Sequence, residues 1–368
     1  MILERYLYRE VLVKLIWIIG LLVLILTSSR FVDYLADAAA GKLPSDLILK
    51  LLLVRMLTVL PRLLPVALFL SVLLALARLS HDKELTIMSG AGLPGSFHLL
   101  SIFRFSLLFA LLVFIVSFFI TPWAENELGL LKSRARQEAD VSGLTAGRFK
   151  EFSRGDRVVY VKEMGGGKQS MKDVFLQVRQ KKRLAVLTSD SARFEDDKKS
   201  GGRYILFENG HRYVGTPGML DYRITTYRHY AVLLQQIDGV TAVRKTEAVP
   251  SSELFGSDIH AYQAEFQWRL SFVIATLLLP LLAVVLNRFS FGENRHVSLM
   301  IGILIYFIYS NMLGISKNLL KRGELEPFIG LWWVHILLII AIVVFLKLQG
   351  ARFRRGRAAA HQLSAVER

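Results

Sequence analysis

Six long apolar stretches constrain the fold of this chain more than any other feature. A helix that crosses the hydrocarbon of a membrane needs about 20 mostly apolar residues, because its backbone groups find hydrogen-bond partners only within the helix. The stretches run approximately over residues 11–29, 51–77, 99–121, 270–286, 297–316 and 330–348. Hydrophobic residues make up 53% of the chain, more than an ordinary globular domain needs. We therefore predict six transmembrane helices.

The distribution of lysine and arginine predicts how these helices are oriented. The first stretch is too long for the apolar part of a signal peptide and no small-x-small cleavage site follows it, so we expect it to remain in the protein. With the N-terminus in the cytoplasm, the inside segments hold more basic residues than the short outside loops. We therefore place both termini in the cytoplasm, including a basic tail at residues 351–368.

Between the third and fourth spans, residues 122–267 form a polar region of a different kind. Apolar and polar residues alternate over 157–163, 173–180, 203–207 and 221–234. This alternation is typical of half-buried strands, and turn-rich segments separate them. We predict an antiparallel sheet, sandwich or jelly roll of about seven or eight strands outside the cytoplasm, reached through a helix over 125–139. Residues 1–121 and 268–350 then hold three spans each.

A short charged segment lies between the second and third spans, on the cytoplasmic side. We predict a helix over 80–90, with Ser80 as its N-cap, Asp82 and Glu84 in its first turn and Gly90 at its end. Ile87, Met88 and Ala91 follow Glu84 on one face and form an apolar ridge beside this carboxylate. The ridge favours docking to a partner protein; a passive turn in the membrane interface is the alternative.

Two arginines, Arg55 and Arg62, fall inside the second span beside two prolines. A cation that faces lipid at this depth costs at least about 2.5 kcal/mol, so we expect these side chains to face a polar cavity or a partner, unless they reach the headgroups. Further basic residues at the outer ends of the first and fifth spans are Arg30, Lys317, Lys321 and Arg322. Together they predict an electropositive rim suited to the phosphates of an anionic lipid.

The chain shows no pattern that is typical of an enzyme. The segment GGGKQS at 165–170 lacks the glycine spacing and the Lys-Ser/Thr pair of a phosphate-binding loop, and we interpret it as a hairpin tip. The eight histidines are scattered without metal-ligand spacing. We expect no catalytic residues, no metal site and no nucleic-acid partner.

Several segments resemble the lipopolysaccharide-export permease family LptF/LptG, over nearly the whole chain. They are RYLYRE near the N-terminus, ELTIMSGAGL in the cytoplasmic segment, VVYVKEMGGGKQSMKDVFLQV in the polar region, WRLSFVIATLLLPLLAVVLN and SLMIGILIYFIYSNMLGISKNLLKRGELEP. The first and the last two are more similar to the LptF branch. Their order along a six-span chain with a β-rich insert makes the resemblance specific.

The resemblance implies a permease subunit of an ABC transporter in the inner membrane of a Gram-negative bacterium. It implies an LptG-like second permease, an LptB-like ATPase dimer that binds ATP and Mg, and LptC-like and LptA-like jelly-roll proteins that receive lipopolysaccharide. No cofactor is implied in this chain. The segment 80–90 corresponds to the family's coupling helix, where Glu84 meets the ATPase groove and Leu85, Ile87 and Met88 fill its apolar part. Arg30 matches a basic position that contacts lipid.

Two other classes of protein are compatible with the residues alone. One is a polytopic membrane enzyme with a catalytic external domain, and the other is a scaffold that anchors an envelope complex without transporting anything. Co-purification with an ATPase that responds to lipid is expected only for the permease.

Overall fold

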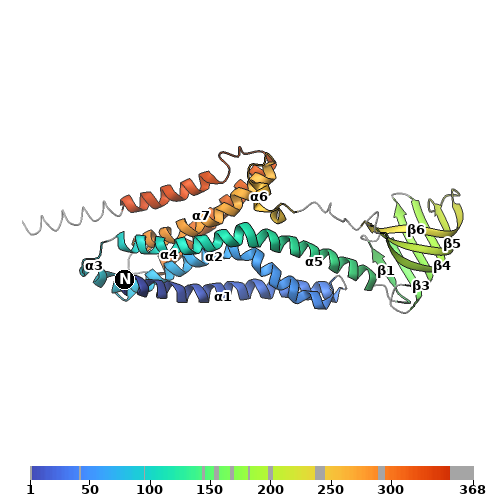
Figure 1. Ribbon diagram of the computed structural model, residues 1–368, viewed down its shortest axis with the longest axis horizontal. Helices are drawn as coiled ribbons and strands as arrows, with labels where there is room; N and C mark the ends of the chain where they lie inside the picture. Colours follow the sequence, from blue (N-terminus) through green and yellow to red (C-terminus); the bar gives the residue numbers. More distant parts are fainter. Residues whose placement is uncertain are drawn as a thin grey trace, which may run out of the picture. The chain divides into compact units, whose positions relative to one another are not determined.

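The structure is a computed structural model of the 368-residue chain. It describes residues 2–40, 43–94, 96–142, 146–152, 157–165, 170–180, 183–197, 202–236, 245–288 and 295–348. The chain divides into two compact units (Figure 1). The first contains residues 1–32, 49–129 and 245–368, and the second contains residues 33–48 and 130–244. The basic tail at 351–368 lies outside the described residues.

Long helices dominate the first unit. The long helices are α1 (Ile2–Ala39), α2 (Ile48–His81), α4 (Ser96–Ile115), α5 (Thr121–Ser142), α7 (His260–Arg288) and α8 (Arg295–Arg322), with a further apolar helix at Trp332–Leu348. The last residues of α1, 33–39, and of α5, 130–142, belong to the second unit. Shorter elements are α3 (Glu84–Gly90), α6 (Ser251–Leu254) and two 3-10 turns at Ser45–Leu47 and Thr246–Ala248. Five helical segments of the described chain are long and apolar enough to cross a membrane. The sixth predicted span corresponds to Trp332–Leu348, which is shorter than those five.

The apolar side chains of the first unit separate into a core and a large exposed surface. Helix α7 packs against α4 and α8, and the core around it includes Leu15, Phe69 and Leu282, each 2% exposed or less. Trp17 and Leu108, in contrast, are 76% and 66% exposed. So much apolar surface on long helices is expected where the surrounding solvent is lipid.

A five-residue π segment, Val116–Ile120, joins α4 to α5 in the third span, and the predicted helix over 125–139 lies within α5. A π turn leaves one residue more per turn than an α-helix, and such turns are frequent at functional sites. Here the freed backbone groups have side-chain partners. Thr121 Oγ1 donates to the carbonyl of Val116 at 2.9 Å, and Ser251 Oγ donates to the carbonyl of Phe118 at 2.6 Å.

The second unit contains one antiparallel sheet of six strands in the order β1-β2-β3-β4-β5-β6. The strands are β1 (Phe149–Phe152), β2 (Arg157–Met164), β3 (Ser170–Gln180), β4 (Arg183–Asp197), β5 (Gly202–Gly215) and β6 (Arg223–Gln236). The four predicted strand segments fall on β2, β3, β5 and β6, which confirms the antiparallel sheet. Across the described residues the sheet has six strands rather than the predicted seven or eight, and the second sheet of a jelly roll or sandwich is not among them.

The predicted hairpin tip at 165–170 connects β2 and β3. Met164 pairs with Met171, and the Gly165 amide donates to the carbonyl of Ser170 at 2.9 Å. Residues 166–169 lie outside the described part of the chain. β2 and β3, the strands on either side of this tip, pair antiparallel, as a hairpin requires.

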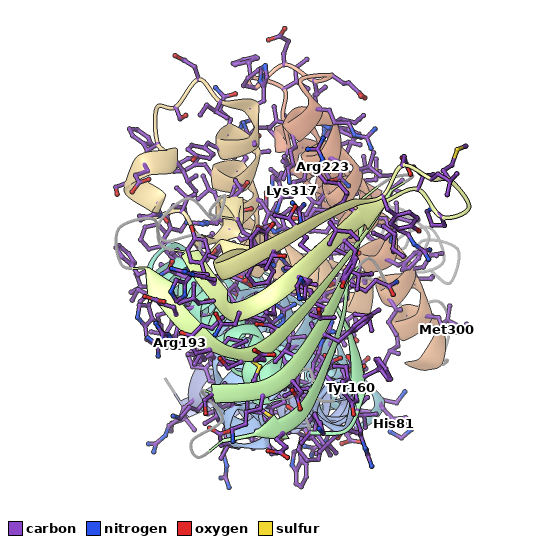
Figure 2. All side chains as sticks on the ribbon, turned by 90° about the vertical axis from the view of Figure 1, so that its right-hand side faces the viewer. His81, Tyr160, Arg193, Arg223, Met300 and Lys317 are labelled. Atoms are coloured by element: carbon purple, nitrogen blue, oxygen red, sulfur yellow. The ribbon has the colours of Figure 1, made fainter. Side chains whose placement is uncertain are left out.

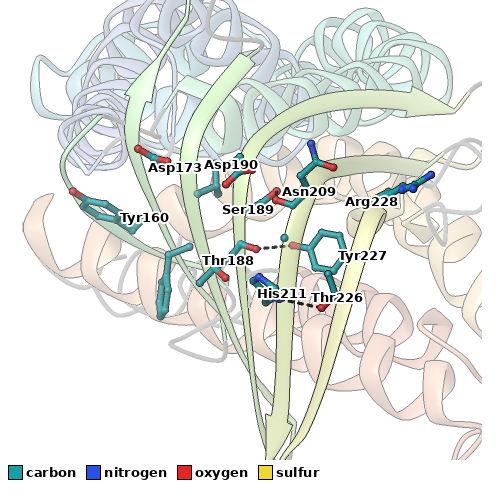
Figure 3. Close-up of a pocket in the computed structure, with 13 residues that line it drawn as sticks. Tyr160, Asp173, Thr188, Ser189, Asp190, Asn209, His211, Thr226, Tyr227 and Arg228 are labelled. Atoms are coloured by element: carbon teal, nitrogen blue, oxygen red, sulfur yellow. Dashed lines mark hydrogen bonds between the residues drawn. The ribbon is translucent and has the colours of Figure 1, made fainter.

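The sheet is interrupted by a transverse row of five residues, which we call the crease. The strand registers place Lys162, Asp173, Asp190, Asn209 and Arg228 opposite one another on β2 to β6, and the regular pairing skips each of them. Asp173 and Asn209 have positive φ angles of 47° and 51°. Figure 3 shows β5 bending beside Asn209.

The crease explains how a single sheet buries a core. Along β3, Met171 is buried on one side of the crease and Val174 and Leu176 on the other, so the alternation of apolar residues changes phase at Asp173. Apolar residues from both halves, including Leu187 and Phe207, form one buried cluster. The two halves of the sheet therefore contribute to the same apolar cluster.

Replacing Gly210, beside the crease, with alanine is expected to destabilise the sheet by about 2 kcal/mol or more. A Cβ at this position would overlap the backbone oxygen of Thr188 and the ring of Tyr227, which donates its hydroxyl to that same oxygen. Limited proteolysis of the full-length protein, followed over temperature, measures this loss. Gly129→Ala is the control, since a Cβ there meets no atom within 4 Å; equal protease resistance of both variants would contradict the prediction.

Candidate functional site

The short helix α3 lies in the charged segment that the sequence predicts to be on the cytoplasmic side. It contains no buried residue, and Ile87 is 69% exposed. Met88 is half-buried, while Leu85 is partly buried against the core of its own unit. Of Leu85, Ile87 and Met88, Ile87 is therefore the most exposed, and Leu85 packs α3 against the core of the first unit.

The boundaries of α3 differ from the predicted helix over 80–90. Helix α2 continues to His81, so Ser80 lies in its last turn and is not an N-cap. Lys83 adopts a left-handed conformation (φ 59°) and separates α2 from α3, which begins at Glu84 and ends at Gly90 as predicted. Asp82 is outside α3; hydrogen bonds from His81 and Arg78 lower the pKa of this carboxyl.

Arg78 links α1, α2 and α3 through three carboxylates. Its guanidinium donates to Glu10 on α1 at 2.6 Å and to Asp82 at 3.1 Å, and it lies 3.6 Å from a carboxylate oxygen of Glu84. The second oxygen of Glu84 accepts a hydrogen bond from the hydroxyl of Tyr6 at 2.9 Å. Glu84 is thus held between the start of α1 and the end of α2. Sequence reasoning did not identify Tyr6, Glu10 or Arg78 as part of this site.

A second cluster forms where α2, α7 and α8 meet around Trp268. The guanidinium of Arg62 lies 5.8 Å from the centre of the indole ring and the ammonium of Lys317 lies 4.7 Å from it. Lys317, which is labelled in Figure 2, also donates to Glu265 at 2.8 Å. Cations over an indole face are attracted to its negative potential. Two of the predicted lipid-binding residues therefore converge on one aromatic ring.

Beneath this cluster lies a buried ion pair that the sequence analysis missed. Arg269 is 1% exposed and donates to Glu265 at 3.2 Å. Its other nitrogens donate to Ser251 Oγ at 2.7 Å and to the carbonyls of Glu247 and Val249, each at 3.0 Å. Opposite charges four residues apart near the start of α7 were the available signal.

The remaining predicted lipid-binding residues have different neighbours. Arg55 forms an ion pair with Glu125 at 3.2 Å, so it faces another helix of its own unit. Arg322 lies 3.8 Å from Glu324 and is exposed. Arg30 and Lys321 are also exposed. The structure therefore brings Arg62 and Lys317 together and does not join all six residues into one described contact network.

The charges near the end of α8 also act on Glu247. Burial raises the pKa of this carboxyl, but a backbone hydrogen bond and the positive charges of Lys317, Lys321 and Lys245 outweigh that effect and leave the pKa below its usual range. The cluster around Trp268 is therefore basic in balance and extends toward Lys321. In the described part of the chain, no group of three His, Asp or Glu residues could hold a metal ion.

Long apolar helices, cationic side chains among them and an additional β-sheet unit are the features of a polytopic membrane protein. The chain belongs to the lipopolysaccharide export system permease family LptF/LptG, whose family model matches residues 5–348. It is 26% identical to the lipopolysaccharide export system permease protein LptF of Escherichia coli K12 over 369 residues, covering 100% of both chains. The LptF protein of Shigella flexneri matches to the same extent. The resemblance of the sequence to this family is thereby confirmed.

Proposed function

We propose that this chain is the transmembrane permease subunit of an ABC transporter that extracts lipopolysaccharide from the inner membrane and passes it to a periplasmic protein bridge. Membership of the lipopolysaccharide export permease family carries the proposal. In this proposal ATP and Mg are bound by a separate ATPase, and an LptG-like second permease completes the transmembrane part. LptC-like and LptA-like proteins receive the lipid from the β-sheet unit.

Helix α3 is the proposed contact with the ATPase. Its exposed Ile87 offers an apolar side chain, and Glu84 offers a carboxylate next to it. Because Glu84 is bonded to Tyr6 and lies beside Arg78, a force on α3 would reach both α1 and α2. A rigid connection of this kind is what a coupling helix requires, since a free side chain would transmit no displacement.

The cluster around Trp268 is the proposed contact with the lipid. Arg62 and Lys317 supply two cations, and Trp268 supplies an aromatic surface. Phosphate groups form charge-assisted hydrogen bonds with such cations, and apolar acyl chains pack against an indole ring. Arg30, Lys321 and Arg322 are proposed as further phosphate contacts at the helix ends, and Arg55 supports the site through its pairing with Glu125.

Removing the charge of Arg62 is expected to weaken lipopolysaccharide binding about tenfold, the effect of losing roughly 1.4 kcal/mol of charge-assisted bonding. Arg62→Gln and Lys317→Gln would be compared by photocrosslinking of the purified complex to radiolabelled lipid. Arg104→Gln is the matched control, because Arg104 is also an exposed arginine but is paired with Glu4 near the opposite end of the first unit's helices. Crosslinking that stays at the wild-type level in both test variants would contradict the phosphate contact.

Purification of the complex tests the function as a whole. The chain should co-purify with a second permease and with two copies of an ATPase whose hydrolysis rate rises when lipopolysaccharide is added. A scaffold or an external enzyme would not bring down such an ATPase. Isolation of the chain alone, from membranes that contain the other components, would count against the proposal.

A further inference from the structure

The outer face of the sheet carries a hollow of about 700 Å³ that the transport proposal does not use (Figure 3). The strand registers place Tyr160, Phe175, Thr188, His211 and Thr226 opposite one another on β2 to β6. These residues alternate along the strands with the buried ones, so they lie on the face opposite the core. The hollow is lined by this row, by four residues of the crease and by their neighbours Val174, Ser189, Gly210 and Tyr227.

The β1–β3 end of the row is aromatic. The ring of Phe149, opposite Tyr160 on β1, lies 4.7 Å from the Tyr160 ring and 6.5 Å from the Phe175 ring. Phe149 is 68% exposed, so much of this aromatic surface remains open to solvent. Cross-strand packing alone would stabilise the sheet. The exposed ring faces also offer a flat apolar surface with negative potential, which attracts the weakly positive C–H groups of a sugar ring.

The rest of the hollow is polar and carries both signs of charge. Asp173, Asp190, Asn209 and Arg228 line it from the crease, and His211 and Thr226 form a pair at 3.2 Å. A phosphate group would meet Asp190 and also Asp173, whose carboxylate is paired with Lys162 at 2.9 Å, and a cation would meet Arg228. Hydroxyl groups, in contrast, donate to carboxylates and accept from guanidinium and amide groups. The charge pattern therefore selects an uncharged ligand that is rich in hydroxyls.

We propose that this hollow binds sugar rings, and specifically the oligosaccharide part of lipopolysaccharide. Its volume falls within the range of about 300–1,000 Å³ that is usual for small-ligand sites and has room for a few rings. The rings would lie against Tyr160 and Phe175, with their hydroxyls bonded to Asp190 and Asn209. The identity of this oligosaccharide rests on the proposed function, whereas the recognition of sugar rests on the hollow itself.

Binding of sugar can be measured on the full chain in detergent by saturation-transfer NMR and titration. The probes are lipopolysaccharide oligosaccharide freed of acyl chains and phosphates, maltohexaose and inorganic phosphate. We expect the first probe to bind. Binding of that probe without maltohexaose supports a site matched to lipopolysaccharide, and binding of both supports a site for sugar rings in general. Binding of phosphate alone, or of no probe, overturns the proposal.

Three substitutions locate the binding at the hollow. Asp190→Ala and Asn209→Gly are each expected to weaken it about tenfold. Glycine tolerates the positive φ of residue 209, so this variant keeps the backbone of the crease. Glu195→Ala is the matched control, because Glu195 is an exposed carboxylate on the same strand as Asp190 and is not part of the hollow. Equal affinity of all three variants would place the binding elsewhere and overturn the proposal.

The test of sugar binding and the test of the transport function can give different outcomes. Oligosaccharide binding that persists when lipopolysaccharide fails to stimulate an ATPase would sustain the sugar site and contradict the transport function. Stimulation of the ATPase without any binding of oligosaccharide would do the reverse.

Discussion

Replacing Arg269 with alanine is expected to lower the free energy of unfolding by about 3–5 kcal/mol. The side chain is 1% exposed and forms hydrogen bonds to Glu265, Ser251 and two backbone carbonyls. Its removal would leave the buried carboxylate of Glu265 with Lys317 as its remaining cation. It would also remove the hydrogen bonds that join Glu247, Val249 and Ser251 to α7. A shift of the thermal unfolding midpoint of the detergent-solubilised protein measures this effect.

Arg269→Lys separates the charge of Arg269 from its hydrogen-bonding geometry, and Arg104→Ala is the control for loss of an exposed arginine. Arg269→Lys keeps the positive charge but cannot supply the several directed donors of a guanidinium, so its loss of stability should be intermediate. Arg104→Ala removes an exposed arginine that forms a surface ion pair with Glu4, which contributes at most about 1 kcal/mol. If Arg269→Ala were no less stable than Arg104→Ala, the bonds of Arg269 to residues 247–251 would not contribute to stability as proposed.

Replacing Glu84 with alanine should abolish productive coupling to the ATPase while leaving insertion of the helices intact. The carboxylate is the group through which α3 is joined to Tyr6 and Arg78, and it is also the proposed charged contact with the partner. We expect the affinity of the permease for the ATPase to fall at least about tenfold, which corresponds to roughly 1.4 kcal/mol. Co-purification yield and lipid-stimulated hydrolysis both report this change.

Tyr6→Phe and Asp82→Ala are the controls for Glu84. The first removes the hydroxyl donor and leaves Arg78 beside Glu84, so coupling should be reduced less than in Glu84→Ala. The second removes a neighbouring carboxylate that lies outside α3. Normal assembly and transport in Glu84→Ala would refute the role of this residue, whatever the controls show.

The sequence predicted the elements whose pattern is local and repetitive. Apolar length alone located the helices, and regular alternation located β2, β3, β5 and β6. β1 and β4 were not among the segments singled out by alternation; the crease interrupts β4 at Asp190, as it interrupts its neighbours. The start of α3 was misplaced because Ser80 fits a capping position locally, while α2 continues through it.

Contacts between distant parts of the chain were beyond prediction from one sequence. The partner of Arg55 is Glu125, 70 residues away, and Arg62 and Lys317 meet only because α2 and α8 both approach Trp268. Glu265 was assigned to the polar region at 122–267 and Arg269 to the segment at 268–350 that holds the last three spans, so the two residues were not considered as a pair. The contacts of Arg55, Arg62 and Lys317 depend on tertiary packing, whereas the spacing of Glu265 and Arg269 is local and only their burial depends on tertiary packing.

The π segment at Val116–Ile120 sets the rotational phase of everything that follows it in the third span. Each residue of an α-helix advances the direction of its side chains by about 100°. Deleting one residue here, so that the helix became α throughout, would turn the next stretch of α5 by about that angle about its axis. Ala124 and Leu128, now 0% and 2% exposed, would then swing away from their buried positions. The π segment therefore sets the rotation of α5 relative to α4, and this rotation keeps Ala124 and Leu128 on the buried side of the helix.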